Sequence, residues 1–246
     1  MEKETEKRAR DLSERAASYG IYTETRFLTE GEQTALSRLP LPLKPRFVGG
    51  FEEAERRLAV FGEEEQLGYP YEAPILLLEI RPKMQKYADS LTHRDLLGAL
   101  MNLGICRDTL GDLILHENVG YQFVLDSIAP FVEENLHRVR HTDVTVRTVP
   151  SLPEGAGVCL EEKVLVCASL RLDAVIGAVF DLSRSDAKAL VENERVTIFG
   201  RTETSASYFV KEGERVSVRG HGRFYFDEES GSTRSGKSRI RVRLYR

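Results

Sequence analysis

The residues best suited to chemistry in this chain are basic side chains near its end, and that chemistry is the binding of a polyanion. The clearest pattern is Arg239-Ile240-Arg241-Val242-Arg243-Leu244, in which charged and apolar residues alternate strictly. A β-strand with this pattern places three arginines on one face, about 7 Å apart, and the apolar residues on the other. Because like charges at that spacing repel one another, we expect these arginines to face phosphates.

The remaining basic candidates lie on two expected helices and on the turns that follow them. The pattern predicts a helix over 171–180 and a second one after Ser183, with Asp186 placed to complete a capping box. Arg184 and Lys188, four residues apart, then share one face of the second helix. Strands are expected at 195–199 and 216–218. The full candidate set is Arg171, Arg184, Lys188, Arg201, Arg219, Arg223, Arg239, Arg241 and Arg243.

These basic residues can also be explained as ordinary solvent-exposed side chains with no ligand. Basic residues are common on any solvated helix face, and an isolated pair such as Arg184 and Lys188 has little meaning by itself. The alternating tail favours binding more strongly. Phe224-Tyr225-Phe226 follows Arg223. We expect at least two of these rings in the core, although some could stack on bases.

The charge distribution supports a polyanion partner at the C-terminal end. The chain of 246 residues has a net charge of −4, but residues 171–246 carry 15 Lys/Arg against 11 Asp/Glu. The preceding 170 residues are therefore acidic. The segment 230–246 has six basic residues and no acidic one. A basic lobe on an acidic protein indicates binding to a nucleic acid or a similar polyanion.

Composition argues against several other classes of protein. No apolar run is long enough to cross a membrane, and the charged N-terminus does not resemble a signal peptide, so we expect a cytoplasmic protein. Cys106, Cys159 and Cys167 form no C-x-x-C pair, which argues against disulfides or zinc. His137 and His141 stand four apart but have no further partners at metal-ligand spacing. We expect no metal and no cofactor.

Three motifs imitate catalytic signatures. His93-Arg94-Asp95-Leu96 resembles a kinase catalytic loop, but Leu100 stands where the magnesium-binding asparagine would be. Arg171-Leu172-Asp173 is similar to a pseudouridine synthase motif, yet too few residues follow it for a synthase domain. The run 232–238 ends in Gly-Lys-Ser without the first glycine of a phosphate loop. If the chain were an RNA-modifying enzyme, the candidates would be His93, Asp95, Arg107 and Asp112.

The order of expected elements divides the chain into three domains of an α+β protein. Residues 1–72 are expected to form a small helical subdomain, with a capping box from Thr29 to Glu32 and a further helix over 52–61. Residues 73–150 predict a β-α-β-β-α-β order, with strands at 75–81, 110–116, 120–125 and 144–149 and helices at 92–103 and 126–139. That is the order of the ferredoxin-like fold, which RNA-recognition modules share with unrelated proteins. After a linker at 151–157, residues 164–246 form the third domain.

The third domain resembles the αL-type, or S-four, RNA-binding domain. The resemblance rests on Arg171-Leu172-Asp173, on the helix from Ser183 and on Arg195–Arg201. The family's Gly-Arg-Val and Asn-Gly turns appear here as Glu194-Arg195-Val196 and Phe199-Gly200. Members bind structured RNA through basic residues of the helical pair and the following turn. The resemblance implies this role for Arg171, Arg184, Lys188 and Arg201.

The chain as a whole resembles the bacterial YlmH family. The motifs are Pro45-x-Phe47-x-Gly49-Gly50-Phe51-x-x-Ala54-Glu55-Arg56, the run Leu91–Arg107 with Gly111-Asp112, and Arg219-Gly220-x-Gly222-Arg223-Phe224. Membership implies a non-catalytic protein that binds ribosomal RNA and tRNA on the large ribosomal subunit. It also implies a role in quality control of stranded peptidyl-tRNA, although relatives are also linked to cell division. We expect no membrane partner, and we favour a monomer.

Overall fold

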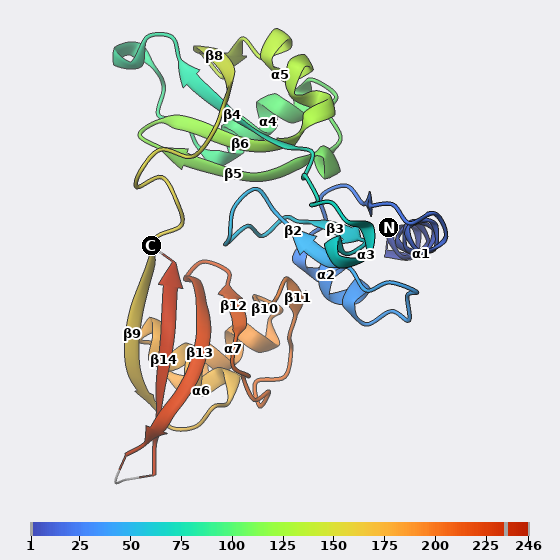
Figure 1. Cartoon of the computed structure of the whole chain (residues 1–246). Helices are drawn as coiled ribbons and strands as arrows, with labels where there is room; N and C mark the ends of the chain where they lie inside the picture. The colour runs from blue at the N-terminus through green and yellow to red at the C-terminus, as the bar shows by residue number, and fades with distance from the viewer. Residues whose placement is uncertain (1, 234–235, 246) are drawn as a thin grey trace. The chain divides into compact units, whose positions relative to one another are not determined.

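A computed structural model describes residues 2–233 and 236–245 of the chain as two compact units (Figure 1). The first unit spans Met1–Gly157 and the second spans Val158–Arg246. Both mix helices with antiparallel sheet, as expected of an α+β protein. The boundary predicted at residue 72 lies inside the first unit. Among the described residues, no helix is both long and apolar enough to cross a membrane.

The N-terminal part of the first unit contains a sheet, which corrects the expectation of a purely helical subdomain. The strands are β1 (Thr23–Glu24), β2 (Arg46–Val48) and β3 (Leu58–Phe61), in the order β1-β3-β2. The helices are α1 (Glu2–Tyr19), α2 (Glu30–Ser37) and α3 (Glu64–Leu67). The capping box of Thr29 and Glu32 is confirmed at the start of α2.

The helix expected over 52–61 is wrong, and burial gives the reason. All four residues of β3 are buried, so this strand is a central one with both faces covered. A continuous apolar run of four fits such a strand, because a surface helix would place some of these residues in solvent. The preceding residues form turns, with the amide of Ala54 donating to the carbonyl of Phe51.

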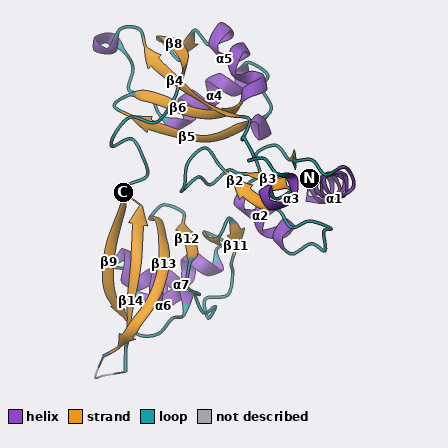
Figure 2. Ribbon diagram, in the orientation of Figure 1, coloured by secondary structure: helices purple, strands orange, loops and turns teal. Residues whose placement is uncertain are grey.

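The central part of the first unit has the predicted elements in the predicted order, with one additional short strand, β7, before the last strand. The elements are β4 (Ile75–Pro82), α4 (His93–Asn102), β5 (Leu110–His116), β6 (Val119–Leu125), α5 (Ala129–Asn135), β7 (Arg138–Val139) and β8 (Thr142–Val149), with 3₁₀ turns at Gln85–Tyr87, Arg107–Thr109 and Asp126–Ile128. The sheet order is β5-β6-β4-β8-β7 with antiparallel neighbours. Strands β5, β6 and β4 can be followed side by side in Figure 2. The helix predicted over 126–139 is shorter, because β7 begins at Arg138.

Helices α4 and α5 cover one face of this central sheet. Their apolar residues, including Leu96, Leu100 and Val132, pack with Leu78 and Ile80 of β4 in one buried cluster. Thr92 and Asp95 form the predicted capping box that starts α4. The β5–β6 hairpin turns through Glu117 and Asn118, both with positive φ, which is the two-residue geometry that matches strand twist.

The second unit is one six-stranded sheet with two helices on one face. Its order is β11-β10-β12-β13-β14-β9, and all neighbours are antiparallel. The elements are β9 (Leu160–Cys167), α6 (Leu172–Phe180), α7 (Arg184–Glu192), β10 (Val196–Ile198), β11 (Arg201–Thr202), β12 (Glu214–Val218), β13 (Gly222–Ser232) and β14 (Ser238–Tyr245). Strand β9 begins at Leu160, four residues before the start predicted for this domain.

The core of the second unit lies between the sheet and its helices. Phe224, Phe226, Ile240 and Val242 are buried in it together with residues of α6 and α7 such as Ile176. The expectation that at least two of the rings at 224–226 belong to the core is therefore confirmed. Residues of opposite parity on β13 and β14 project from the other face of the sheet, which neither helix covers.

Candidate nucleic-acid interface

Arg171 and Arg184 are brought together by one buried carboxylate. Asp173, in the first turn of α6, is 1% exposed and accepts two hydrogen bonds from Arg171, at 3.1 Å from Nε and 2.9 Å from Nη2. Nε of Arg184, the first residue of α7, lies 3.5 Å from the same carboxylate. Burial alone would raise the pKa of Asp173, but both guanidinium groups hold it below its ordinary value.

The position of this cluster follows from local backbone structure. The start of α6 is fixed by a loop of the same unit, because the amides of Leu172 and Asp173 donate to the carbonyls of Tyr208 and Ala206. The start of α7 is fixed by Ser183, whose hydroxyl accepts from the amide of Asp186. Asp173 thus lies in the first turn of α6, where the positive helix end favours a carboxylate, and the side chain of Arg184 reaches it from α7.

Lys188 and Arg201 are two further basic residues of the candidate set, and both are exposed. Lys188 lies one turn after Arg184 on the exposed face of α7 and pairs with Glu192 at 3.5 Å. An exposed pair of this kind is weak, so the ammonium group can exchange its partner for a phosphate. Arg201 begins β11 at the edge of the sheet and is exposed. The turn before it passes through Phe199 and Gly200, both with positive φ.

The β14 arginines confirm the predicted alternation, but two of them have acidic partners that the argument from mutual repulsion did not include. Arg239, Arg241 and Arg243 project from the face opposite Ile240 and Val242. Arg241 pairs with Glu162 at 3.3 Å and with Glu228 at 3.4 Å, and Arg243 pairs with Asp227 at 2.8 Å. The argument from mutual repulsion is therefore wrong for two of the three. The neighbouring strands β9 and β13 supply the acidic groups, which spacing within β14 could not reveal.

A pair of stacked tyrosines completes this outer face. Tyr225 and Tyr245 have ring centroids 5.7 Å apart, and the guanidinium of Arg243 lies 5.1 Å from the Tyr225 centroid. Arg223 lies 6.0 Å from the Tyr245 centroid. Arg215, which sequence reasoning missed, is 4% exposed and donates to the Tyr245 hydroxyl at 3.4 Å. The structure places it opposite Tyr225 in the β12–β13 register, a relationship that the sequence alone does not show.

Seven of the nine candidates therefore belong to two faces of the second unit, with the sheet between them, whereas Arg201 lies at the edge of the sheet. Arg171, Arg184 and Lys188 lie on the helix side, whereas Arg223 and the β14 arginines lie on the outer side. Arg219 is exposed in the turn after β12, where its amide donates to the carbonyl of Arg195 at 2.8 Å. The single cationic surface expected from the sequence is thus divided. Carboxylates neutralise part of it.

The four residues considered for catalysis do not form one site. Asp95 caps α4 and pairs with Arg140 at 3.7 Å, whereas Arg107 and Asp112 follow the other end of that helix. Ten helical residues separate these ends by about 15 Å. Arg107 donates to the carbonyl of Leu110, and Asp112 accepts from the amide of Arg56, so both have structural partners.

Neither a metal cluster nor a phosphate loop is seen in the part of the chain that the structure describes. Groups of three or more potential metal ligands are absent among the described residues, His137 and His141 included. Of the run 232–238, Arg234 and Ser235 lie outside the described residues. Its first residue, Ser232, instead ends β13, and its last residue, Ser238, begins β14.

Comparison with known proteins gives three similarities. A family model described as "Putative RNA-binding domain in YlmH" matches residues 72–152. The chain is 32% identical over 225 residues to a Bacillus subtilis protein named "Ribosome-associated protein quality control protein P2", covering 88% of this chain and 84% of that one. A solved structure titled "Cell division protein ylmH from Streptococcus pneumoniae" is 19% identical, with a TM-score of 0.49, and covers 60% of this chain and 90% of that one.

Proposed function

The chain belongs to the YlmH family, and from that premise we propose that it is a non-catalytic RNA-binding protein of the large ribosomal subunit. Its ligands would be ribosomal RNA and the tRNA of stalled peptidyl-tRNA complexes, in ribosome-associated quality control. The name of the Bacillus subtilis relative, with similarity over most of both chains, supports the process. The family model over 72–152 supports RNA as the ligand.

The main support for this proposal is the contact of Arg171 and Arg184 with the buried carboxylate of Asp173. An arginine has five N–H donors, and Arg171 uses two of them on the carboxylate. The remaining donors are fixed in direction, because the buried carboxylate restricts the guanidinium plane. Preoriented donors lose less conformational freedom on binding a phosphate. Arg184 and Lys188 then offer two further cations along the exposed side of α7.

Two domain assignments are part of the proposal. The strand order β5-β6-β4-β8 around α4 and α5 supports a ferredoxin-like domain over 73–150. The pair α6–α7 beside the strands that follow supports an S-four-type domain over 164–246. Residues 1–72 would form a subdomain attached to the central domain. A cytoplasmic location follows from a ribosomal partner.

The test of this function uses the full chain and purified large ribosomal subunits. The variant Arg184→Glu with Lys188→Glu should abolish salt-sensitive binding. A matched control, Lys163→Glu with Lys211→Glu, changes the net charge of the second unit equally at residues outside the candidate set. With about five phosphate contacts, wild-type protein should give a log–log salt slope of roughly −3.5 to −4.5. Wild-type affinity in the first variant would refute the helix-side interface.

A further inference from the structure

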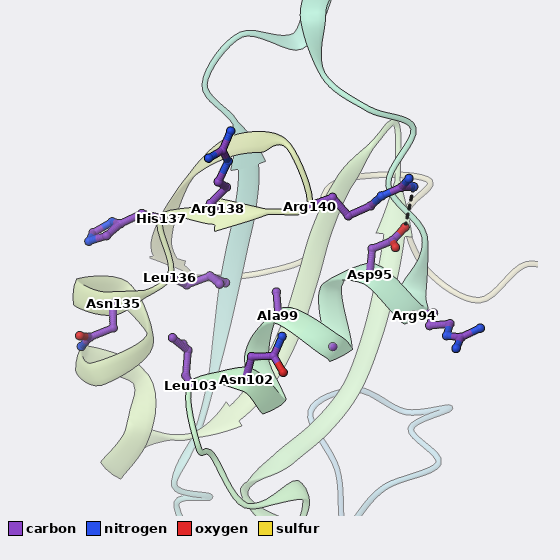
Figure 3. Close-up of a pocket in the computed structure, with 11 residues that line it drawn as sticks. Arg94, Asp95, Ala99, Asn102, Leu103, Asn135, Leu136, His137, Arg138 and Arg140 are labelled. Atoms are coloured by element: carbon purple, nitrogen blue, oxygen red, sulfur yellow. Dashed lines mark ion pairs between the residues drawn. The ribbon is translucent and has the colours of Figure 1, made fainter.

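A groove of about 630 Å³ lies in the central part of the first unit, between α4 and the segment that follows α5 (Figure 3). Gly98, Ala99, Leu103 and Leu136 supply its apolar lining. Its polar side chains are Arg94, Asp95, Asn102, Asn135, His137, Arg138 and Arg140. The volume is in the range of ligand-binding sites, and the polar lining residues come from α4 and from the segment 135–140.

The charge of this groove contrasts with that of its surroundings. Residues 72–152 carry 8 Lys/Arg against 11 Asp/Glu, yet three arginines and one aspartate line the groove. Arg140 lies 3.7 Å from Asp95, and Arg138 lies 3.7 Å from Asp143. Both arginine side chains are at least half exposed, so these ion pairs are weak and leave guanidinium donors available. The groove is thus a basic site on an acidic surface.

Gly98 adds an independent observation. It lies within α4, where glycine costs roughly 0.5–1 kcal/mol relative to alanine. A Cβ built at this position would meet no other atom within 4 Å, so packing inside the protein does not require glycine here. The absent side chain instead leaves the helix backbone open toward the groove. A ligand that approaches this backbone closely would account for the residue.

The opposite face of the central sheet is less suited to binding. Tyr121 and Phe123, the aromatic residues of β6 on that face, are 4% and 6% exposed. Phe51 stacks on Phe123 with ring centroids 5.4 Å apart. Glu79 adds a carboxylate there, held by Arg81 and Arg147 at 2.9 Å each. Bases cannot stack on buried rings, so the helix side is the accessible one.

We propose that the α4–α5 groove binds the phosphodiester backbone of a single-stranded RNA segment. This inference rests on the proposed function for the class of ligand, and it assigns a second contact outside the C-terminal unit. Arginine side chains match phosphate oxygens, while Asn102 and Asn135 can bond to sugars or base edges. An acidic peptide is less favoured, because no Phe, Tyr or Trp is present among the lining residues to anchor its side chains.

The test measures binding of the full chain to a fluorescent single-stranded RNA of 20 random nucleotides. Arg94→Gln with Arg138→Gln should weaken binding roughly tenfold and make the salt slope shallower by about 1.5. Lys83→Gln with Lys86→Gln removes the same charge from the same unit outside the groove, and it should change affinity less than about twofold. Gly98→Ala should weaken binding severalfold while raising the melting temperature by a few degrees.

Two outcomes would overturn the groove assignment. One is equal affinity loss in the two glutamine pairs together with wild-type affinity in Gly98→Ala. The other is displacement of the RNA by polyglutamate as efficiently, per charge, as by unlabelled RNA, which would indicate an acidic peptide ligand. Crosslinking to 4-thiouridine-labelled ribosomal RNA separates the two proposals. Crosslinks confined to the second unit would refute the groove alone, and their absence from both units would refute the proposed function as well.

Discussion

Arg171 holds the buried carboxylate of Asp173 by two hydrogen bonds, of 3.1 and 2.9 Å, while about a third of its own side chain stays exposed. The two groups are separated by one residue, at the start of α6. This geometry makes Asp173 a positioning residue rather than an RNA contact, because it is too buried to reach a ligand. The arginine, in contrast, connects the interior of the fold with the surface.

Replacing Asp173 by asparagine separates orientation from net charge. Asp173→Asn removes a negative charge near a proposed RNA site, so simple electrostatics predicts tighter binding. If the carboxylate orients the guanidinium groups, binding should instead weaken severalfold, and the second unit should lose roughly 1–2 kcal/mol of unfolding free energy. RNA titration and urea unfolding measure the two effects. Tighter binding by the variant would contradict the positioning role.

Asp112 predicts a pH dependence of stability in the first unit. Burial raises its pKa to about 6 from an ordinary value of 3.8, while the amide of Arg56 donates to its carboxylate at 3.0 Å. A carboxyl group with a raised pKa stabilises the fold fully below about pH 4, and this contribution is lost as pH rises through 6. Asp112→Asn removes the effect and keeps an acceptor for Arg56.

Hydrogen exchange of the first unit, measured from pH 4 to 7, gives the unfolding free energy of Asp112→Asn and of the wild type. The quantity of interest is the difference between these two free energies at each pH. As pH rises over this range, the unfolding free energy of the variant should increase relative to that of the wild type by up to about 3 kcal/mol. Because the difference cancels the titration of other carboxylates, it isolates one group. A flat difference would show that Asp112 titrates normally.

Gly50 packs so closely against Phe123 of the central sheet that we expect a larger residue to be destabilising at this position. A Cβ at Gly50 would lie 2.1 Å from Cδ1 of Phe123, a distance that the structure has to relieve by moving the ring or the loop. Gly50→Ala should therefore destabilise the first unit by about 1–3 kcal/mol. Gly157→Ala is the matched control, since a Cβ there meets no atom within 4 Å. Similar melting temperatures for both variants would contradict the close packing.

Local signals explain which parts of the fold were predictable. The capping boxes of Thr29 with Glu32 and of Thr92 with Asp95 involve residues three apart, so both were visible in the sequence. The alternation along β14 was visible for the same reason. Strand β3 was missed because its apolar run is short and follows Arg56-Arg57, which suits a helix equally well. Only its central place between β1 and β2 decides in favour of a strand.

The candidate site was less predictable, because strand pairing decides the state of its charges. Arg241 pairs with Glu162 of β9 and with Glu228 of β13, which lies opposite it in the β13–β14 register. Partners this far apart in sequence depend on which strands become neighbours, so composition could not reveal them. The Arg171–Asp173 pair was local, and the Arg-Leu-Asp motif contained it. That motif supported the S-four resemblance and Arg171 as an RNA contact, but it did not reveal that Asp173 positions the arginine.

Arg243→Gln and Arg239→Gln are similar substitutions in β14, but we expect the first to affect stability and the second to affect RNA binding. Arg243 pairs with Asp227, whose side chain is 20% exposed, so Arg243→Gln leaves a partly desolvated carboxylate and should cost about 1 kcal/mol of unfolding free energy. Arg239 is exposed at the start of β14, so Arg239→Gln should leave stability unchanged and weaken RNA binding about threefold. Urea unfolding and RNA anisotropy on the same two variants distinguish these roles. If Arg243→Gln lost affinity and Arg239→Gln lost stability, the division of this outer face into structural and ligand-binding arginines would be wrong.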